Sequence, residues 1–375
     1  MSRPEIFHEI RFHIFAAYTL THTVMDKKPG DSPKMHVTVV IAAIIVILAG
    51  MMYAANFVTQ MLLAFFISIV LAYPILWLQS RKVPLGLAVA IVFIVILGIS
   101  FGFGELIRSS LSSFSGDIPK YEANLREMSA GLLQFLNDMG FQLSRDSMTG
   151  VLDPSRIMNL TANFLGQLGS FMGNALTIVF LALFLLLELD SINLKTRAIL
   201  KGSNESVENL KRITSSIRHY LSIKTVTSLM TGIFIWIGLL IIGVDYAIIW
   251  GLIAFLFNYI PNIGSIIAAI PAVIFALVQL GLSGVIWTTV IFVSVNMIIG
   301  NAVEPKMMGR GMGLSTFVVF LSLLFWGFIL GVVGMFLSVP ITMTIKIMLE
   351  KSADTRWMAI LLGTRRDAEM EMERE

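Results

Sequence analysis

Four uninterrupted apolar stretches restrict the chain to one class of fold. Met35–Ala54, Phe57–Leu78, Leu85–Phe103 and Phe171–Leu189 each approach the length of about 20 apolar residues at which a helix crosses a hydrocarbon core. They are apolar on every face, whereas the strands of a membrane barrel alternate polar and apolar residues. Charged residues make up only 14% of the chain, against about a quarter in an ordinary globular domain. The sequence therefore predicts an all-α polytopic membrane protein.

Basic residues predict which connections face the cytoplasm. Lys34 precedes the first apolar stretch, and Arg81 and Lys82 lie between the second and the third, so both connections are expected inside. Residues 105–170 carry seven acidic and five basic residues, which suits the periplasmic or extracellular side, and their leucine spacing predicts amphipathic helices there. After the fourth stretch the basic residues return, and residues 191–222 are expected to form a cytoplasmic interfacial helix with one apolar face.

The C-terminal half has shorter apolar runs. After a fifth span at Ile223–Gly243, the runs Ala247–Ile260, Ser265–Gly281 and Val285–Gly300 are brief for full crossings, which indicates broken or re-entrant helices. Leu314–Leu349 is too long for one span, and Gly331 and Gly334 are expected to divide it. The total is about eight transmembrane helices, or up to ten if the short runs also cross the membrane.

These assignments divide the chain into five parts. They are a cytoplasmic N-terminal tail at 1–34, three transmembrane helices at 35–104, the outside segment at 105–170, a C-terminal transmembrane core at 171–350 and a charged cytoplasmic tail at 351–375. The first 34 residues lack the apolar region of a secretory signal. They are expected to be either a cytosolic tail or the result of a mis-assigned start, in which case Met25 is the candidate for the true beginning. The protein is expected in the bacterial inner membrane, with both termini in the cytoplasm.

The first candidate site is the segment Asn258–Gly264, between two apolar runs. Pro261 removes a backbone donor, and Gly264 permits a close backbone approach. Asn258 and Asn262 bring amide groups that suit a neutral polar solute, because transporters bind their cargo where helices break at membrane depth. The alternative interpretation is a cytoplasmic turn whose asparagines cap helix ends. Both interpretations stay open.

The second candidate site runs from Asn296 to Gly309. Asn296 lies in an apolar run, Asn301 follows it, and Glu304 stands directly before Pro305, which should direct the backbone away from helix. A carboxylate near the bilayer centre costs about 3 kcal/mol on insertion scales, so it is retained for a partner or a function. One interpretation makes Glu304 the group that titrates or binds a cation. The other is a solvated loop in which Glu304 pairs with Lys306.

Several classes of function are excluded or disfavoured. The chain has no cysteine and none of the nucleotide-binding, zinc-protease or serine-hydrolase motifs, so we expect no enzyme, no metal site, no cofactor and no ATP-driven transport. The net charge of +3 is what positive inside loops generate, so no nucleic-acid partner is expected. The expected partners are membrane lipid and a small polar solute. Secondary transport, a passive pore and a non-transporting scaffold remain.

Three stretches resemble the autoinducer-2 exporter (AI-2E) family. They are Asn258–Ser265 with Ala269–Pro271 after it, Gly300–Gly309, and Gly313–Ser322 running into Gly334–Pro340. The last two are close to the TqsA-type members of that family. The family's order of three spans, an outside segment and a larger C-terminal helical set also fits from about Met25 to Leu362.

The resemblance implies an inner-membrane, homo-oligomeric exporter of autoinducer-2, a small furanone-like sugar derivative used in quorum sensing. Other members of the family resemble sodium(lithium)/proton antiporters, which is the alternative function. On the exporter hypothesis the transport path is lined by Asn258, Pro261, Asn262, Gly264, Asn296 and Asn301, and Glu304 with Lys306 couples transport to Na⁺ or H⁺.

Overall fold

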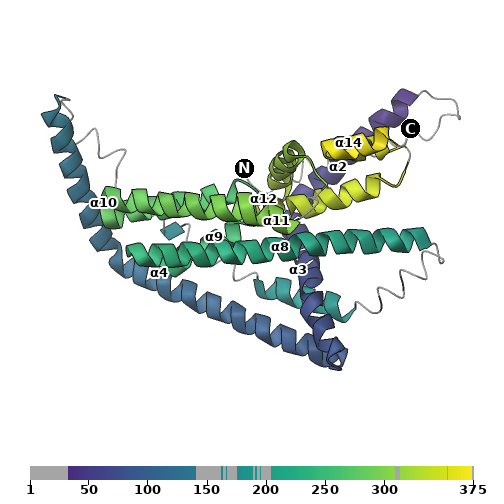
Figure 1. The fold of residues 1–375 in the computed structure, drawn as a ribbon, viewed down its shortest axis with the longest axis horizontal. Helices are drawn as coiled ribbons and strands as arrows, with labels where there is room; N and C mark the ends of the chain where they lie inside the picture. The colour runs from purple at the N-terminus through teal and green to yellow at the C-terminus, as the bar shows by residue number, and fades with distance from the viewer. Residues whose placement is uncertain are drawn as a thin grey trace, which may run out of the picture. The chain divides into compact units, whose positions relative to one another are not determined.

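A computed structural model describes residues 33–140, 175–188, 204–308, 313–352 and 354–373, with residues 162, 163, 166, 191 and 195 between them. Every regular element among these residues is a helix (Figure 1). Five of the described helices are long and apolar enough to cross a membrane, and three shorter ones are apolar. The prediction of an all-helical, multi-pass membrane protein is confirmed. Almost all of the tail at 1–34, and most of residues 141–203, lie outside the described part.

The chain divides into two compact units, Met1–Ala54 and Ala55–Glu375, each of which we describe by itself. In the first unit, α2 (Pro33–Tyr53) opens on proline, a residue that suits a first helical turn because its missing N–H has no partner there anyway. Its large apolar side chains are exposed; Ile45 is 61% and Tyr53 71% accessible. A helix that is apolar all round is suited to lipid.

The second unit begins with two helices joined by a tight turn. In α3 (Ala55–Ser80), Pro74 lies inside the helix; the turn after it has Lys82 at a φ of 66°. The next helix, α4 (Leu85–Asp138), has 54 residues, a length of roughly 80 Å at 1.5 Å per residue. That length exceeds the ~30 Å of a hydrocarbon core, so the outside segment predicted from residue 105 begins as a continuation of the third predicted span.

Helix α8 (Asn204–Ile242) is likewise long, with 39 residues. Residues 204–222, predicted to lie within an interfacial helix, and the predicted fifth span are therefore parts of one helix of roughly 58 Å. The short helix α9 (Ala247–Phe257) crosses it at a pair of glycines. A Cβ added to Gly232 would lie 2.8 Å from the carbonyl oxygen of Gly251, so larger residues would force the two helices apart.

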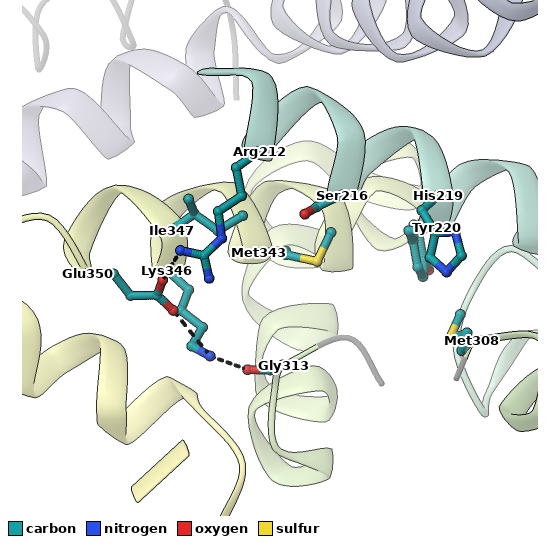
Figure 2. A pocket seen from close by; sticks show the side chains of 10 residues that line it. All are labelled: Arg212, Ser216, His219, Tyr220, Met308, Gly313, Met343, Lys346, Ile347 and Glu350. Atoms are coloured by element: carbon teal, nitrogen blue, oxygen red, sulfur yellow. Dashed lines mark hydrogen bonds and ion pairs between the residues drawn. The ribbon is translucent and has the colours of Figure 1, made fainter. Parts of the chain in front are cut away.

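Helices α10 (Gly264–Ile298) and α12 (Thr316–Leu349) are each a hairpin of two arms. The backbone leaves helical geometry at Gly281 (φ 69°) and at Gly331 (φ 65°), a conformation that glycine adopts without a steric cost. The open ends of each hairpin are joined. Ser265 Oγ donates to Asn296 Oδ1 at 2.8 Å, and Lys346 Nζ donates to the Gly313 carbonyl at 2.6 Å (Figure 2). The prediction that Gly331 divides the last apolar stretch is confirmed.

The segment after α10 does not break at Pro305 as the sequence suggested. A π-helix, η1 (Ile299–Val303), leads into α11 (Glu304–Met308), and Glu304 has helical φ and ψ angles of −58° and −48°. In an α-helix the ring of Pro305 would meet the carbonyl of Asn301, four residues earlier. The wider π-turn displaces that carbonyl, so the chain passes the proline without unwinding.

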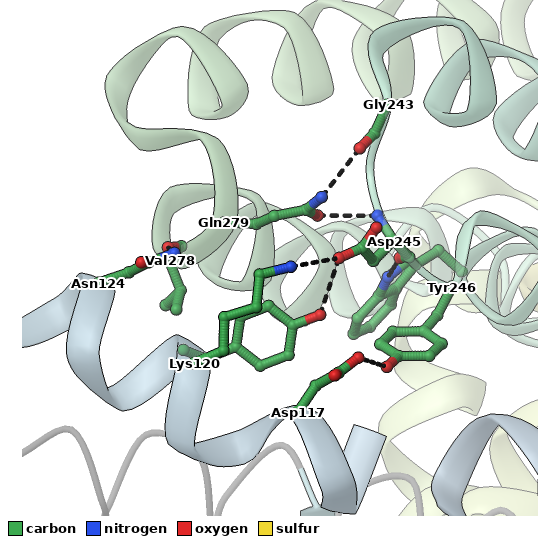
Figure 3. Close-up of polar contacts among 10 residues, drawn as sticks. Asp117, Lys120, Asn124, Gly243, Asp245, Tyr246, Val278 and Gln279 are labelled. Carbon is green, nitrogen blue, oxygen red and sulfur yellow. Dashed lines mark hydrogen bonds and ion pairs between the residues drawn. The ribbon is translucent and has the colours of Figure 1, made fainter. Parts of the chain in front are cut away.

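The second half of α4 is attached to the ends of α8, α9 and α10 (Figure 3). Tyr121 donates to Asp245 Oδ2 at 2.9 Å, and Tyr246 donates to Asp117 Oδ2 at 2.6 Å. Below these contacts the buried rings of Phe114, Tyr121 and Phe275 pack together. This cluster fixes the end of the bundle opposite to the open ends of the two hairpins.

At the open end of α12, two short helices close the chain. These are α13 (Arg356–Leu362) and α14 (Arg365–Met372). The Ser315 amide donates to the Leu362 carbonyl at 3.1 Å, and Lys346 Nζ donates to Asp367 Oδ2 at 2.8 Å. Lys346 thus joins both arms of the hairpin to the C-terminal segment.

We expect the attachment of α14 to depend on the ionised Asp367 carboxylate. Burial raises its pKa, but hydrogen bonds from Lys346 and the Thr364 amide outweigh burial, and the pKa lies below the ordinary 3.8. A lowered pKa stabilises the folded form above the ordinary value and ceases to do so as the pH falls through the lowered one. Attachment should therefore not change between about pH 8 and 5. It should weaken only as the pH falls below the ordinary pKa of 3.8, and it should be lost as the pH falls through the lowered pKa.

The variant Asp367→Asn should detach α14 already at neutral pH. Amide hydrogen exchange of Gly363 and Thr364 in the full-length protein should then be about tenfold faster, which corresponds to the loss of about one hydrogen bond. Glu373→Gln, in the same terminal segment, is the matched control. Unchanged exchange in Asp367→Asn would contradict the role given to this carboxylate.

Candidate functional site

A buried ion pair lies at the centre of the second unit. Lys224, on α8, donates from Nζ to both carboxylate oxygens of Glu304, at 2.8 Å to Oε1 and 3.0 Å to Oε2. The side chain of Lys224 is 5% exposed and that of Glu304 is 17% exposed. The pair joins two segments 80 residues apart, at the point where the π-helix η1 passes into α11.

The face of α8 that carries Lys224 is polar from Tyr220 to Thr231. Polar residues follow at helical spacing on either side, and all of them are buried, namely Tyr220, Thr227, Ser228 and Thr231. Thr227 and Thr231 donate their hydroxyls back to the helix, to the carbonyls of Lys224 and Thr227. The Tyr220 hydroxyl is buried without a hydrogen-bond partner among the residues that the structure describes. Such a group is costly, which marks this face as more than packing surface.

The first candidate segment meets this face through two side chains. Asn258 caps α9, is buried, and donates from Nδ2 to Ser228 Oγ at 3.0 Å. Tyr259 donates its hydroxyl to Thr225 Oγ1 at 2.9 Å. Asn258 therefore lies one helical turn along α8 from Lys224.

The remaining residues of that segment form the turn. Asn262 is exposed with a left-handed φ of 61°, and the carbonyl of half-buried Pro261 accepts from the Ile263 amide at 2.7 Å. Gly264 is buried, and a Cβ there would overlap the Phe257 carbonyl. The first part of the segment thus contacts the polar face of α8, and its second part makes a tight turn.

The second candidate segment is divided in the same way. Glu304 is bound to Lys224, and half-buried Asn296 accepts from Ser265 inside the α10 hairpin. Asn301 and Lys306 are exposed. The partner of Glu304 is thus Lys224 and not Lys306, because α11 is helical and positions two apart on a helix point in different directions.

The two candidate segments of the sequence do not include three residues of this site, Tyr220, Lys224 and Ser228. The charge pattern alone indicates for Lys224 only that it is one of the basic residues on the cytoplasmic side, after the fourth apolar stretch. The available signal was its position directly before an apolar run, with Tyr220 and Ser228 four residues to either side. A lysine one turn inside an apolar helix, on a face with other polar residues, is a stronger sign of a site than of a loop.

The arrangement can exist in more than one charge state. While Glu304 is ionised, it neutralises Lys224 in apolar surroundings. Protonation of Glu304, or a cation bound to it, releases the lysine and leaves an ammonium group that costs several kcal/mol unless another group accepts from it.

Comparison with known proteins agrees with the resemblance stated from the motifs. The sequence pattern that defines the AI-2E family transporters matches residues 41–354 of this chain. A protein of Haemophilus influenzae named "Putative transport protein" is 42% identical over 330 residues, which cover 86% of this chain and 94% of the relative.

Two proteins of Escherichia coli K12 are similar over comparable lengths. "Putative transport protein YhhT" is 37% identical over 339 residues, covering 90% of this chain and 97% of that protein. "AI-2 transport protein TqsA" is 35% identical over 329 residues, covering 88% of this chain and 96% of that protein. The match extends across α3 to α12, so it includes both halves of the buried ion pair.

Proposed function

The chain belongs to the AI-2E family of transporters, and we propose that it is a secondary transporter that exports a small polar metabolite, autoinducer-2, with Lys224 and Glu304 as its coupling site. The cargo is suggested by the relative named as an AI-2 transport protein. The coupling site is suggested by the geometry of the ion pair.

The observation that carries the proposal is the burial of this pair. Replacing a buried ion pair by well-packed apolar residues is often neutral or stabilising, so stability alone does not require one. Ionisable groups inside membrane proteins instead mark solute and ion pathways. Lys224 and Glu304 also lie beside a π-helix and a broken segment, where freed backbone groups can bind a solute.

In the proposed cycle the two groups exchange partners. When Glu304 takes up a proton, Lys224 loses its counter-charge. The neutral polar groups next to Lys224 are then the hydroxyl groups of Tyr220 and Ser228 and the amide group of Asn258. A solute with several hydroxyl groups can complete those hydrogen bonds. Release of the proton on the other side restores the pair and expels the solute.

The membrane location, oligomeric state and number of spans that we propose are those expected from the sequence. We place the protein in the bacterial inner membrane as a homo-oligomer with about eight spans, and with both termini in the cytoplasm. The α10 and α12 hairpins are its re-entrant elements, because their arms of about 15 to 18 residues are short for full crossings.

Sodium(lithium)/proton antiport is the second candidate. It is favoured by the 17% exposure of the Glu304 side chain, which leaves a carboxylate that a hard cation can reach in competition with Lys224. In this version the cation replaces the ammonium on the carboxylate oxygens, and the solute has no part in the cycle.

Vesicles that contain the purified full-length protein and a pH-sensitive dye separate the two functions. The exporter should move autoinducer-2 out of loaded vesicles together with protons, and sodium alone should evoke no proton flux. Sodium-evoked proton flux without any movement of autoinducer-2 would support the antiporter instead. Empty vesicles and vesicles that contain the Tyr73→Phe variant, an exposed position on α3, serve as controls.

A further inference from the structure

A pocket of about 220 Å³ opens between α8, α11 and α12, next to the coupling site (Figure 2). Arg212, Ser216 and His219 line it from α8, and Glu350 and Lys346 line it from the second arm of α12. Its remaining wall is apolar and is made mainly by Met308, Met343 and Ile347. Pockets that hold drug-sized molecules measure about 300–1,000 Å³, so this one suits a smaller ligand.

The charged groups of the pocket are already matched to one another. Arg212 lies 3.2 Å from Glu350, and Lys346 is bound to the Gly313 carbonyl and to Asp367, with Glu350 at 3.5 Å. An anion would have to break these contacts and compete with two carboxylates. The charges therefore favour an uncharged ligand.

Neutral polar groups in the pocket are still available. The Ser216 hydroxyl and the His219 imidazole make no hydrogen bond among the described residues. The hydroxyl of Tyr220, a residue that is 4% exposed, is buried and also lacks a partner among the described residues. Two hydroxyls and an imidazole beside methionine side chains suit a small molecule that has several hydroxyl groups and an apolar face.

The pocket also shares two helix faces with the ion pair. Tyr220 precedes Lys224 by one turn of α8, and Met308 follows Glu304 by one turn of α11. Tyr220 and Met308 pack in the same cluster. A ligand against these residues therefore lies one helical turn from both charges of the coupling site.

We propose that this pocket is the cytoplasm-facing binding site for the transported solute, an uncharged, hydroxyl-rich metabolite of about the size of a pentose. The inference rests on the proposed transport function and adds the place and the chemistry of recognition. On binding, Tyr220 turns its buried hydroxyl toward the solute, and this movement, one helical turn from Lys224, couples the occupied pocket to the Lys224–Glu304 pair. Tyr220 is a binding residue in this scheme, and the ion pair is the coupling element.

The absence of cysteine from the chain permits a direct test. In full-length Ser216→Cys reconstituted in vesicles, a small neutral thiol reagent should label the introduced thiol, and autoinducer-2 should slow the labelling at least fivefold. Ribose 5-phosphate, a charged compound of similar size, should give no protection. Labelling of Ser352→Cys, at an exposed position on the same side, should not respond to either compound.

Tyr220→Phe, added to Ser216→Cys, tests recognition without loss of a protein hydrogen bond. It should raise the autoinducer-2 concentration for half-maximal protection about fivefold to tenfold, the usual effect of one lost hydrogen bond. Tyr73→Phe is the matched control and should change nothing.

Flux of autoinducer-2 measured in the same vesicles separates this inference from the proposed function. Flux without protection, or protection by ribose 5-phosphate alone, would overturn the pocket assignment and leave the transport function standing. Protection without flux would support the pocket and count against export. The loss of both would overturn both.

Discussion

Lys224→Met is expected to destabilise the protein and to abolish coupled transport. It leaves the Glu304 carboxylate inside the protein without its counter-charge, and the loss of one member of a buried pair costs about 3–5 kcal/mol. Glu304→Gln should be less destabilising, because an amide can still accept a hydrogen bond from Lys224. Transport should fall roughly 100-fold or more in both variants, since an increase of only about 2.7 kcal/mol in the activation free energy of transport accounts for that factor.

The double variant Lys224→Met/Glu304→Gln separates stability from function. It has no buried charge at this place, so its thermal unfolding midpoint should return close to that of the unchanged protein. Transport should remain lost, because nothing is left that can take up and release a proton. If the double variant transports at the original rate, the pair serves structure alone. Midpoints are measured on full-length protein in detergent, and flux in vesicles.

The second large effect is expected for Gly334→Ala, at the contact between the two arms of α12. A Cβ at this position would overlap the Trp326 carbonyl oxygen and lie 2.6 Å from the Trp326 carbonyl carbon and 2.8 Å from Leu330 Cβ. Backbone cannot rotate away as a side chain can, so the arms have to separate. We expect a loss of about 3 kcal/mol or more, at the upper end of the range for overpacking.

Gly98→Ala on α4 is the matched control for this substitution. Nothing lies within 4 Å of a Cβ added there. Alanine is favoured over glycine in a helix by up to about 1 kcal/mol, so the unfolding midpoint should stay the same or rise slightly. Equal effects of the two substitutions would show that the arms of α12 do not pack as closely as the structure has them.

Local features of the chain were predictable from the sequence. The apolar runs have a length that only membrane helices have, and Gly331 divides the last run because a single helix of that length would exceed the bilayer. Glu304 could be singled out as a candidate because a carboxylate beside apolar helical turns is energetically costly unless it has a partner or a function. Asn258 was identified because it stands at a helix break, and it does reach the polar face of α8.

Pairings between distant segments were not predictable in this way. The sequence offered Lys306 as the partner of Glu304 because it is close along the chain, whereas the fold brings Lys224 from 80 residues away. The pairing of the two arms within α10 was not predictable for the same reason, because nothing local in the sequence requires Ser265 to lie beside Asn296. The full lengths of α4 and α8 were also not predictable, because both helices continue past the ends of the apolar runs.

The most direct test of the account is to observe the protonation of Glu304 during transport. Difference infrared spectra of the reconstituted protein, recorded on addition of autoinducer-2, report the carbonyl stretch of a carboxyl group that takes up a proton. We predict that such a band appears with cargo, shifts with deuterium, and is absent from Glu304→Gln. A carboxylate that stays ionised and paired with Lys224 throughout turnover, with flux undiminished, would contradict the account.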